Sequence, residues 1–161
     1  GEAFGKESIW QAIQLCGAHR IGHATRLVED MVFDPQGNVI ALGQLAQYIL
    51  DTRLPLEICL LSNVHTGAVD KLENHPFIKL YKEKFRVFLN TDDRLMSDTT
   101  LTKEYTIASE LFGISLDDIE KLNINAMKSS FIHYKERLHY IYNVIKPGYQ
   151  KTREKLLSLK V

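Results

Sequence analysis

Acid–base side chains sit at three points where predicted β-strands end. Glu2 lies near the start of the sequence, His23 closes the segment 20–23, and Asp92 and Asp93 follow the apolar run 85–89. Parallel α/β sheets keep their chemistry at the carboxyl ends of the strands, so we expect these groups to meet. Adjacent side chains on a strand point to opposite faces, so the two aspartates can serve different ligands, one a metal and one a substrate. A plain Asp-Asp turn is the alternative.

The segments around these residues form a linked set of motifs. Gly1-Glu2, Gly22-His23 and Asn90-Thr91-Asp92-Asp93 occur in this order, with Ser62-Asn63 and the segment 125–131 at matching places. The set resembles the zinc-dependent adenosine deaminase family in its bacterial form, which carries His-Ala-Gly-Glu after its fifth strand, Gly-His-Gly after its sixth and Asn-Thr-Asp-Asp after its eighth. The resemblance extends from residue 1 to about Lys146. It implies a (β/α)8 barrel that converts adenosine to inosine and ammonia.

The resemblance also implies a role for each matching residue. Glu2 would protonate ring nitrogen N1 of the purine while His23 orients and stabilises the attacking hydroxide. Asp92 would bind Zn²⁺, which lowers the pKa of its bound water to about 7. Gly1 and Asp93 would bind the substrate. Asp93 would face purine N7, and either Asp93 or N7 must then carry the proton. The structural alternatives are a solvated Glu2 and a His23 that only supports the fold.

Several features of the family are missing from this sequence. The sequence starts inside the His-Ala-Gly-Glu motif and has no His-x-His pair, so Asp92 is the one family zinc ligand that it retains. Ala24 stands where the family usually has Gly, and Leu60-Leu61 stands where Cys-Pro is common. A complete barrel needs roughly 200–250 residues, whereas this chain has 161. We therefore expect residues 1–161 to be a single partial domain, the C-terminal half of a (β/α)8 barrel with extra C-terminal helices.

A half barrel leaves its outer strands without neighbours, so we expect a partner. The partner would be the missing N-terminal half or a second copy of the chain, and the isolated chain would be inactive. A related enzyme that deaminates adenine or another 6-aminopurine is the alternative within the same class. The alternative from a different class is an inactive module that acts only in assembly.

The order of predicted elements is that of a parallel sheet with helical connections. Apolar spacing predicts helices that include Ile9 to Cys16, a helical layer over 25–32, and a stripe from Leu42 to Ile49. Strands are predicted over 18–23, 57–61 and 85–89, a turn over 34–38 and a short helix over 76–84. The remaining chain is predicted to be helical, with a capping pattern at 115–118 and with Pro147-Gly148 separating a last amphipathic helix.

Composition narrows the class of protein. The net charge is +0, with 20 basic and 20 acidic residues, so the charge favours neither nucleic acid nor an anionic membrane. No apolar run approaches the 18 residues of a membrane span. Cys16 and Cys59 are interpreted as buried thiols of a reducing compartment, which makes the cytoplasm the expected location. Trp10 is predicted to be in the core. The remaining histidines share no ligand spacing and are interpreted as structural or surface residues: His19, His65, His75, His133 and His139.

Overall fold

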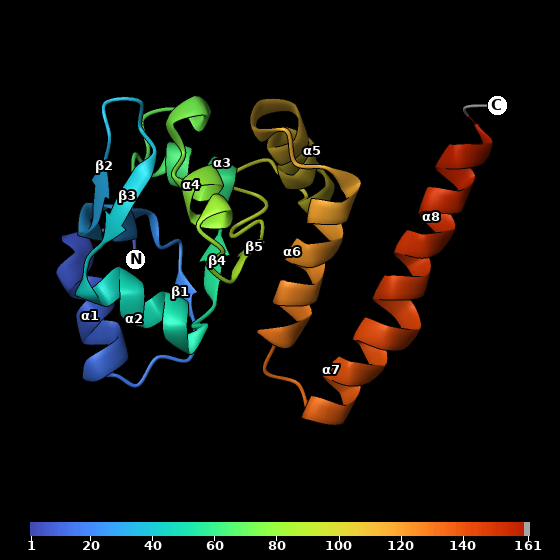
Figure 1. Cartoon of the computed structure of the whole chain (residues 1–161), viewed down its shortest axis with the longest axis horizontal. Helices are drawn as coiled ribbons and strands as arrows, with labels where there is room; N and C mark the ends of the chain where they lie inside the picture. The colour runs from blue at the N-terminus through green and yellow to red at the C-terminus, as the bar shows by residue number, and fades with distance from the viewer. Residues whose placement is uncertain (160–161) are drawn as a thin grey trace. The chain divides into compact units, whose positions relative to one another are not determined.

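The computed structural model describes residues 1–159. The backbone forms two compact units, Gly1–Ile114 and Ser115–Val161, and each is described here by itself (Figure 1). The first unit carries every residue of the predicted site. The single partial domain over 1–161 remains a prediction.

A three-stranded parallel sheet is the centre of the first unit. Its strands are β1 (Ile21–Gly22), β4 (Leu56–Ile58) and β5 (Val87–Leu89), in the spatial order β1-β4-β5. Gly22 lies opposite Glu57, and Ile58 lies opposite Leu89. Parallel pairing needs a long crossover between strands, and helices supply it here. The carboxyl ends of the three strands therefore open onto the same edge, where His23, Ser62 and Asp92 follow.

Helices and short helical turns surround this sheet. They are α1 (Gly5–Gln14), the 3-10 helix η1 (Thr25–Asp30), α2 (Gln44–Thr52), α3 (Leu60–His65), the 3-10 turn η2 (Leu72–Asn74), α4 (Phe77–Lys82) and α5 (Leu101–Phe112). Apolar side chains from these helices and from the strands make the core. The largest of the fully buried apolar ones are Ile9, Leu27, Ile49, Leu56, Ile58, Leu60, Phe77 and Leu80.

An antiparallel hairpin takes the place of part of the helical layer predicted over 25–32. After η1 the chain forms β2 (Met31–Phe33), which pairs with β3 (Val39–Leu42). The predicted turn over 34–38 is confirmed, because the Asp34 side chain accepts hydrogen bonds from the backbone and side chain of Asn38. Leu42 thus belongs to a strand, and the helical stripe starts only in α2. The sequence does not predict this strand, because the apolar run over 31–33 is too short to show a helical or strand periodicity.

The strand predicted over 57–61 is shorter and lies earlier in the chain. It ends at Ile58, and Leu60 already opens helix α3. The Glu57 side chain is partly buried and pairs with Arg20 at 2.9 Å, so this strand is not apolar on both faces. Leu60 is completely buried within a helix instead. In the sequence, apolar residues that follow a strand directly are indistinguishable from the strand itself. Here Leu60 and Leu61 are predicted to be strand but belong to α3.

The second unit is entirely helical in the residues that the structure describes. It contains α6 (Leu116–Lys128), α7 (Tyr134–Tyr140), the π-helical turn η3 (Ile141–Ile145) and α8 (Lys146–Ser158). The predicted cap of α6 is confirmed, since Ser115 and Asp118 bond each other's backbone reciprocally. The prediction that Pro147-Gly148 separates a last amphipathic helix is wrong, because η3 runs directly into α8 and α8 buries none of its described side chains. Proline removes one helical hydrogen bond, and the wider π turn ends two residues before Pro147.

Two predictions about burial are wrong. Cys16 is exposed, whereas Cys59 is buried as expected. Trp10, on α1, is 48% exposed. Cys16 continues the spacing of the predicted stripe, but α1 ends at Gln14, so Cys16 lies beyond the helix. Trp10 directly follows the buried Ile9 in α1, and spacing does not predict how far burial extends around a helix. None of the helices that the structure describes is long and apolar enough to cross a membrane.

Candidate active site

Glu2, His23 and Asp92 come together at the carboxyl edge of the sheet. His23 follows β1, and its Nε2 lies 3.7 Å from Oε1 of Glu2 and 3.8 Å from Oδ2 of Asp92. The His23 and Glu2 side chains are 21% and 23% exposed, and the Asp92 side chain is 45% exposed. The three predicted groups thus converge around one imidazole nitrogen and remain open to solvent.

Unusual backbone angles aim two of these side chains. His23 has φ +66° and Asp92 has φ +55°, both in the left-handed region. Residues other than glycine adopt this region rarely, although His and Asp do so more often than most. His23 directly follows β1, and Asp92 lies three residues after the end of β5. The backbone changes direction at both places. The left-handed turns bring the side chains toward each other rather than along their strands.

Glycine is required at position 1 by close packing. A Cβ on Gly1 would lie 2.8 Å from the Ala24 nitrogen and from the Gly22 oxygen. The Gly1 carbonyl accepts a hydrogen bond from the Arg26 amide at 3.1 Å, and Arg26 also donates from its side chain to the Glu2 carbonyl at 2.9 Å. These contacts fix the segment that presents Glu2. The substrate-binding role of Gly1 stays a prediction.

The two adjacent aspartates have different surroundings. Asp92 Oδ2 accepts a hydrogen bond from the Ser62 hydroxyl at 2.7 Å. Asp93 Oδ1 accepts from the backbone amides of Leu95 and Met96 at 3.1 and 3.2 Å, which is the geometry of an Asp-capped turn. Asp93 is exposed. The side chains therefore face different partners, as adjacent residues after a strand can. Their assignment to metal and substrate remains a prediction.

Helix α3 and the residue that caps its C-terminus supply polar side chains that hold Glu2 in place. Oε2 of Glu2 accepts a hydrogen bond from Asn63 Nδ2 at 2.8 Å and one from the Thr66 hydroxyl at 3.1 Å. Asn63 is completely buried, and its amide also meets His23 Nδ1 at 2.9 Å and His75 Nε2 at 3.1 Å. Asn63 thus touches three ionisable side chains.

Sequence reasoning missed two buried residues behind the site. The sequence predicts no more than a structural or surface role for His75, which is 1% exposed and bonded to Asn63. Glu104, on α5, was not singled out at all. It is fully buried, accepts from the Leu60 amide at 2.8 Å and from the Thr99 hydroxyl at 2.9 Å, and so holds the start of α3. Burial raises the pKa of its carboxyl group. A lone His or Glu carries no sequence signal for such contacts.

Within residues 1–159, no cluster of three or more His, Cys, Asp or Glu side chains has the geometry of a metal site. Zinc in proteins takes three or four side-chain ligands. Asp92 fits as one of them, because its carboxylate is partly exposed and faces the same space as His23. The described residues alone therefore do not form a zinc site.

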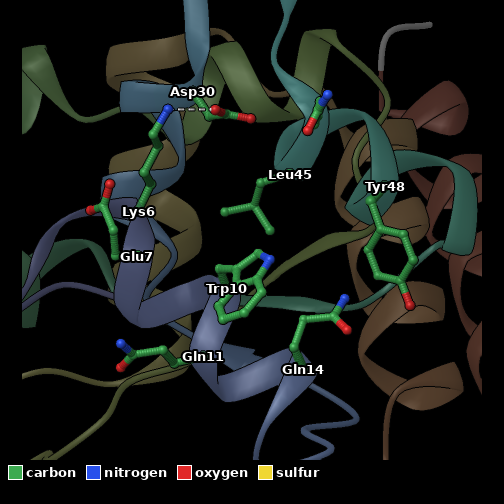
Figure 2. Close-up of a pocket in the computed structure, with 9 residues that line it drawn as sticks. Lys6, Glu7, Trp10, Gln11, Gln14, Asp30, Leu45 and Tyr48 are labelled. Carbon is green, nitrogen blue, oxygen red and sulfur yellow. Dashed lines mark hydrogen bonds and ion pairs between the residues drawn. The ribbon is translucent and has the colours of Figure 1, made fainter.

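A separate pocket of about 600 Å³ lies between α1 and α2 (Figure 2). Trp10, Leu45 and Tyr48 line it, together with a Lys6–Asp30 ion pair of 2.7 Å. None of the residues that converge on His23 line this pocket. The acid–base groups of the candidate site are therefore not part of it.

Comparisons with known proteins identify the family of the chain. A family model described as adenosine deaminase matches residues 1–147. The chain is 48% identical over 157 residues to adenosine deaminase 1 of Streptomyces coelicolor. The aligned region covers 98% of this chain and 39% of that protein.

Solved structures show the fold. The adenine deaminase of Arthrobacter aurescens superposes with a TM-score of 0.80 at 23% identity, over 93% of this chain and 42% of that one. A Burkholderia ambifaria amidohydrolase with bound Zn superposes with a TM-score of 0.78 at 13% identity, over 96% of this chain and 40% of that one.

The chain spans about two fifths of the length of these proteins. The expected fold is confirmed: the parallel strands β1, β4 and β5 with their helices form part of a (β/α)8 barrel. Family match, sequence identity and fold agree, and the chain belongs to the adenosine deaminase family.

Proposed function

We propose that this chain is the C-terminal half of a barrel that deaminates adenosine to inosine by hydrolysis. Water adds to C6 of the purine, the 6-amino group leaves as ammonia, and an oxygen takes its place. The observation that carries the proposal is that His23 Nε2 lies within 4 Å of both Oε1 of Glu2, at 3.7 Å, and Oδ2 of Asp92, at 3.8 Å. A carboxyl group and an imidazole at this spacing suit proton transfer to the ring and to the leaving group.

Glu2 is proposed as the acid that protonates N1. Attack of water on C6 removes the aromaticity of the ring, and a proton on N1 offsets that cost. Asn63 and Thr66 hold Oε2 of Glu2, so Oε1 is the oxygen that faces His23 and the open side of the site. Asp93, at the exposed edge, is proposed to bind purine N7 together with backbone contacts from Gly1.

Zinc is proposed as the cofactor, with Asp92 as one ligand and the other ligands outside this chain. Bound zinc would supply a hydroxide near neutral pH. Ser62 would orient the ligand, because its hydroxyl donates to Asp92 Oδ2. A hydrogen bond to a metal-binding carboxylate orients the carboxylate oxygens toward the metal.

The substrate is proposed to be the nucleoside rather than the free base. The relative with 48% identity is named adenosine deaminase, whereas the adenine deaminase structure shares the fold at 23% identity. An inactive assembly module is the remaining alternative. Glu2 is held by hydrogen bonds beside His23. An assembly module would not require such a pair of acid–base groups, so this arrangement favours the enzyme.

The test is Glu2→Gln in the full-length protein, assayed for ammonia release from adenosine and from adenine. General acid catalysis is worth about 10²- to 10⁴-fold, so kcat for adenosine should fall at least that far with metal content unchanged. The control is Glu7→Gln, at an exposed carboxylate on α1, which should keep wild-type turnover. Wild-type turnover in Glu2→Gln would exclude Glu2 as the acid. A wild-type protein that deaminates only adenine would favour the free-base alternative, and one that deaminates neither would favour the assembly module.

A further inference from the structure

A chain of hydrogen bonds leads from the backbone at the start of α4 to His23. The Phe77 amide donates to His75 Nδ1 at 3.0 Å, and His75 Nε2 meets Asn63 Oδ1 at 3.1 Å. Asn63 Nδ2 then meets His23 Nδ1 at 2.9 Å and donates to Glu2 Oε2 at 2.8 Å. His75 and Asn63 are 1% and 0% exposed, so no competing bond from water is expected to replace these contacts.

The Phe77 amide at one end of this hydrogen-bond series determines which group donates and which accepts in every bond of the series. A backbone N–H can only donate, so His75 Nδ1 must accept. Burial lowers the pKa of His75 to about 4, so the ring is neutral near pH 7 and its single proton is on Nε2. His75 therefore donates to Asn63 Oδ1. The amide oxygen of Asn63 is thereby turned toward His75 and its NH₂ group toward Glu2 and His23.

The same reasoning fixes the proton on the next ring. Because Asn63 Nδ2 donates, His23 Nδ1 must accept, and a neutral His23 then carries its proton on Nε2. Nε2 is the atom that faces Glu2 and Asp92. In this tautomer His23 presents an N–H donor to an oxygen nucleophile between those carboxylates. In the other tautomer it would present a lone pair and repel that oxygen.

We propose that His75 is a positioning residue that, acting through Asn63, holds His23 in its Nε2–H tautomer. The inference deepens the proposed function, because it states how the imidazole of that same site is prepared for an oxygen nucleophile. His75 itself does not reach Glu2 Oε1 or the open side of the site. Its contribution passes through the orientation of one buried carboxamide.

Two substitutions of His75 separate this role from a structural one. His75→Gln places an amide nitrogen at the bond depth of the missing Nε2, so it can still donate to Asn63. His75→Asn places its amide at the depth of Nδ1, so it can still accept from the Phe77 amide but cannot reach Asn63. A purely structural role at the start of α4 would be rescued by Asn. The proposed role would be rescued by Gln.

The experiment uses the full-length protein labelled with ¹⁵N in its histidine rings. NMR identifies which nitrogen of His23 carries the proton, and steady-state assays give kcat and KM. We expect a protonated Nε2 in wild type and in His75→Gln, and a loss of that preference in His75→Asn. Loss of a second-sphere partner typically lowers activity about 10- to 100-fold. We expect such a fall in kcat for His75→Asn, with KM and metal content unchanged.

A second variant keeps the proposal testable if His75→Asn does not fold. Asn63→Asp can still accept from His75, but it replaces the NH₂ group by an oxygen, so His23 should move its proton to Nδ1. The control is His139→Asn, since His139 is exposed and also bonds an asparagine, Asn143, at 3.1 Å. It should change neither the His23 signals nor kcat.

An unchanged Nε2–H of His23 in both His75→Asn and Asn63→Asp would overturn the proposal. So would rescue of kcat by His75→Asn and not by His75→Gln. The NMR readout does not depend on turnover. If wild-type protein deaminates no purine, the proposed function fails while the tautomer measurement still decides the role of His75.

Discussion

The carboxylate of Glu2 and the imidazole of His23 lie 3.7 Å apart, from Oε1 to Nε2, although Glu2 precedes α1 and His23 follows β1. Asn63 joins them from behind, because its single amide nitrogen meets the other oxygen of Glu2 and the other nitrogen of His23. The two acid–base groups are thus held by the same carboxamide and present their remaining polar atoms to the same space. Such pre-orientation reduces the rearrangement that a reaction needs.

His23→Ala should lower kcat more than it raises KM in the full-length protein. In the proposed mechanism His23 contacts the oxygen nucleophile rather than the purine, so its contribution should arise mainly in the transition state. Steady-state kinetics with adenosine is the measurement. His19→Ala, at an exposed histidine in the same loop region, is the control. A variant whose only defect is a higher KM contradicts this role.

Asp92→Ala should lose metal and activity together, whereas Asp93→Asn should keep the metal and lose turnover. The two carboxylates have different partners, the Ser62 hydroxyl for Asp92 and two backbone amides for Asp93. Elemental analysis of each purified full-length variant, alongside an ammonia assay, is the measurement. The full-length wild-type protein should hold about one zinc per site, and a chelator should remove activity. Equal metal loss in both variants refutes the division between the two aspartates.

The free energy of unfolding should fall as the pH falls from about 6.5 to about 4, in part because of His75. Burial lowers the pKa of its ring from the ordinary value of 6.5 to about 4. Between these values the unfolded state binds a proton that the native state does not, so acid favours unfolding. A shift of this size corresponds to roughly 3 kcal/mol, at about 1.4 kcal/mol per pH unit.

Urea unfolding of the full-length protein at pH 7.5 and pH 4.5 measures this dependence. His75→Gln has no titrating ring at this position and should lose a matching share of the acid sensitivity. Exposed His133→Gln should retain it. An unchanged pH dependence in His75→Gln means that the ring is protonated in the native state or does not titrate there.

The chain by itself should not remain a monomer in solution. β1 and β5 each pair only with β4 among the described residues, so both have an unpaired edge that can recruit another strand. Large apolar side chains are also open to water, with Phe4 79%, Leu95 91% and Met96 81% exposed. Size-exclusion chromatography with light scattering is the measurement, first alone and then with the N-terminal half of the barrel. A compact monomer that unfolds cooperatively contradicts the half-barrel interpretation.

Local motifs in the sequence predict the family and the partial barrel, and they indicate Glu2, His23 and Asp92 at the strand ends as the candidate site. They can do so because strand ends are local features, and parallel strands bring their carboxyl ends to one edge whatever the details of packing. The capping box of α6 and the turn at 34–38 were also within reach of the sequence. Their hydrogen bonds join residues only three or four positions apart.

The contacts that link distant segments are visible only once the chain is folded. Asn63 meets Glu2 across 61 positions and His23 across 40, and Glu104 meets Leu60 across 44. No periodicity encodes such pairs, because they depend on how helices α3 and α5 settle against the sheet. The same holds for the end of β4 and for the exposure of Trp10. Short apolar runs and the edges of helical stripes take their state from packing, since burial rather than local preference supplies most of the free energy that fixes them.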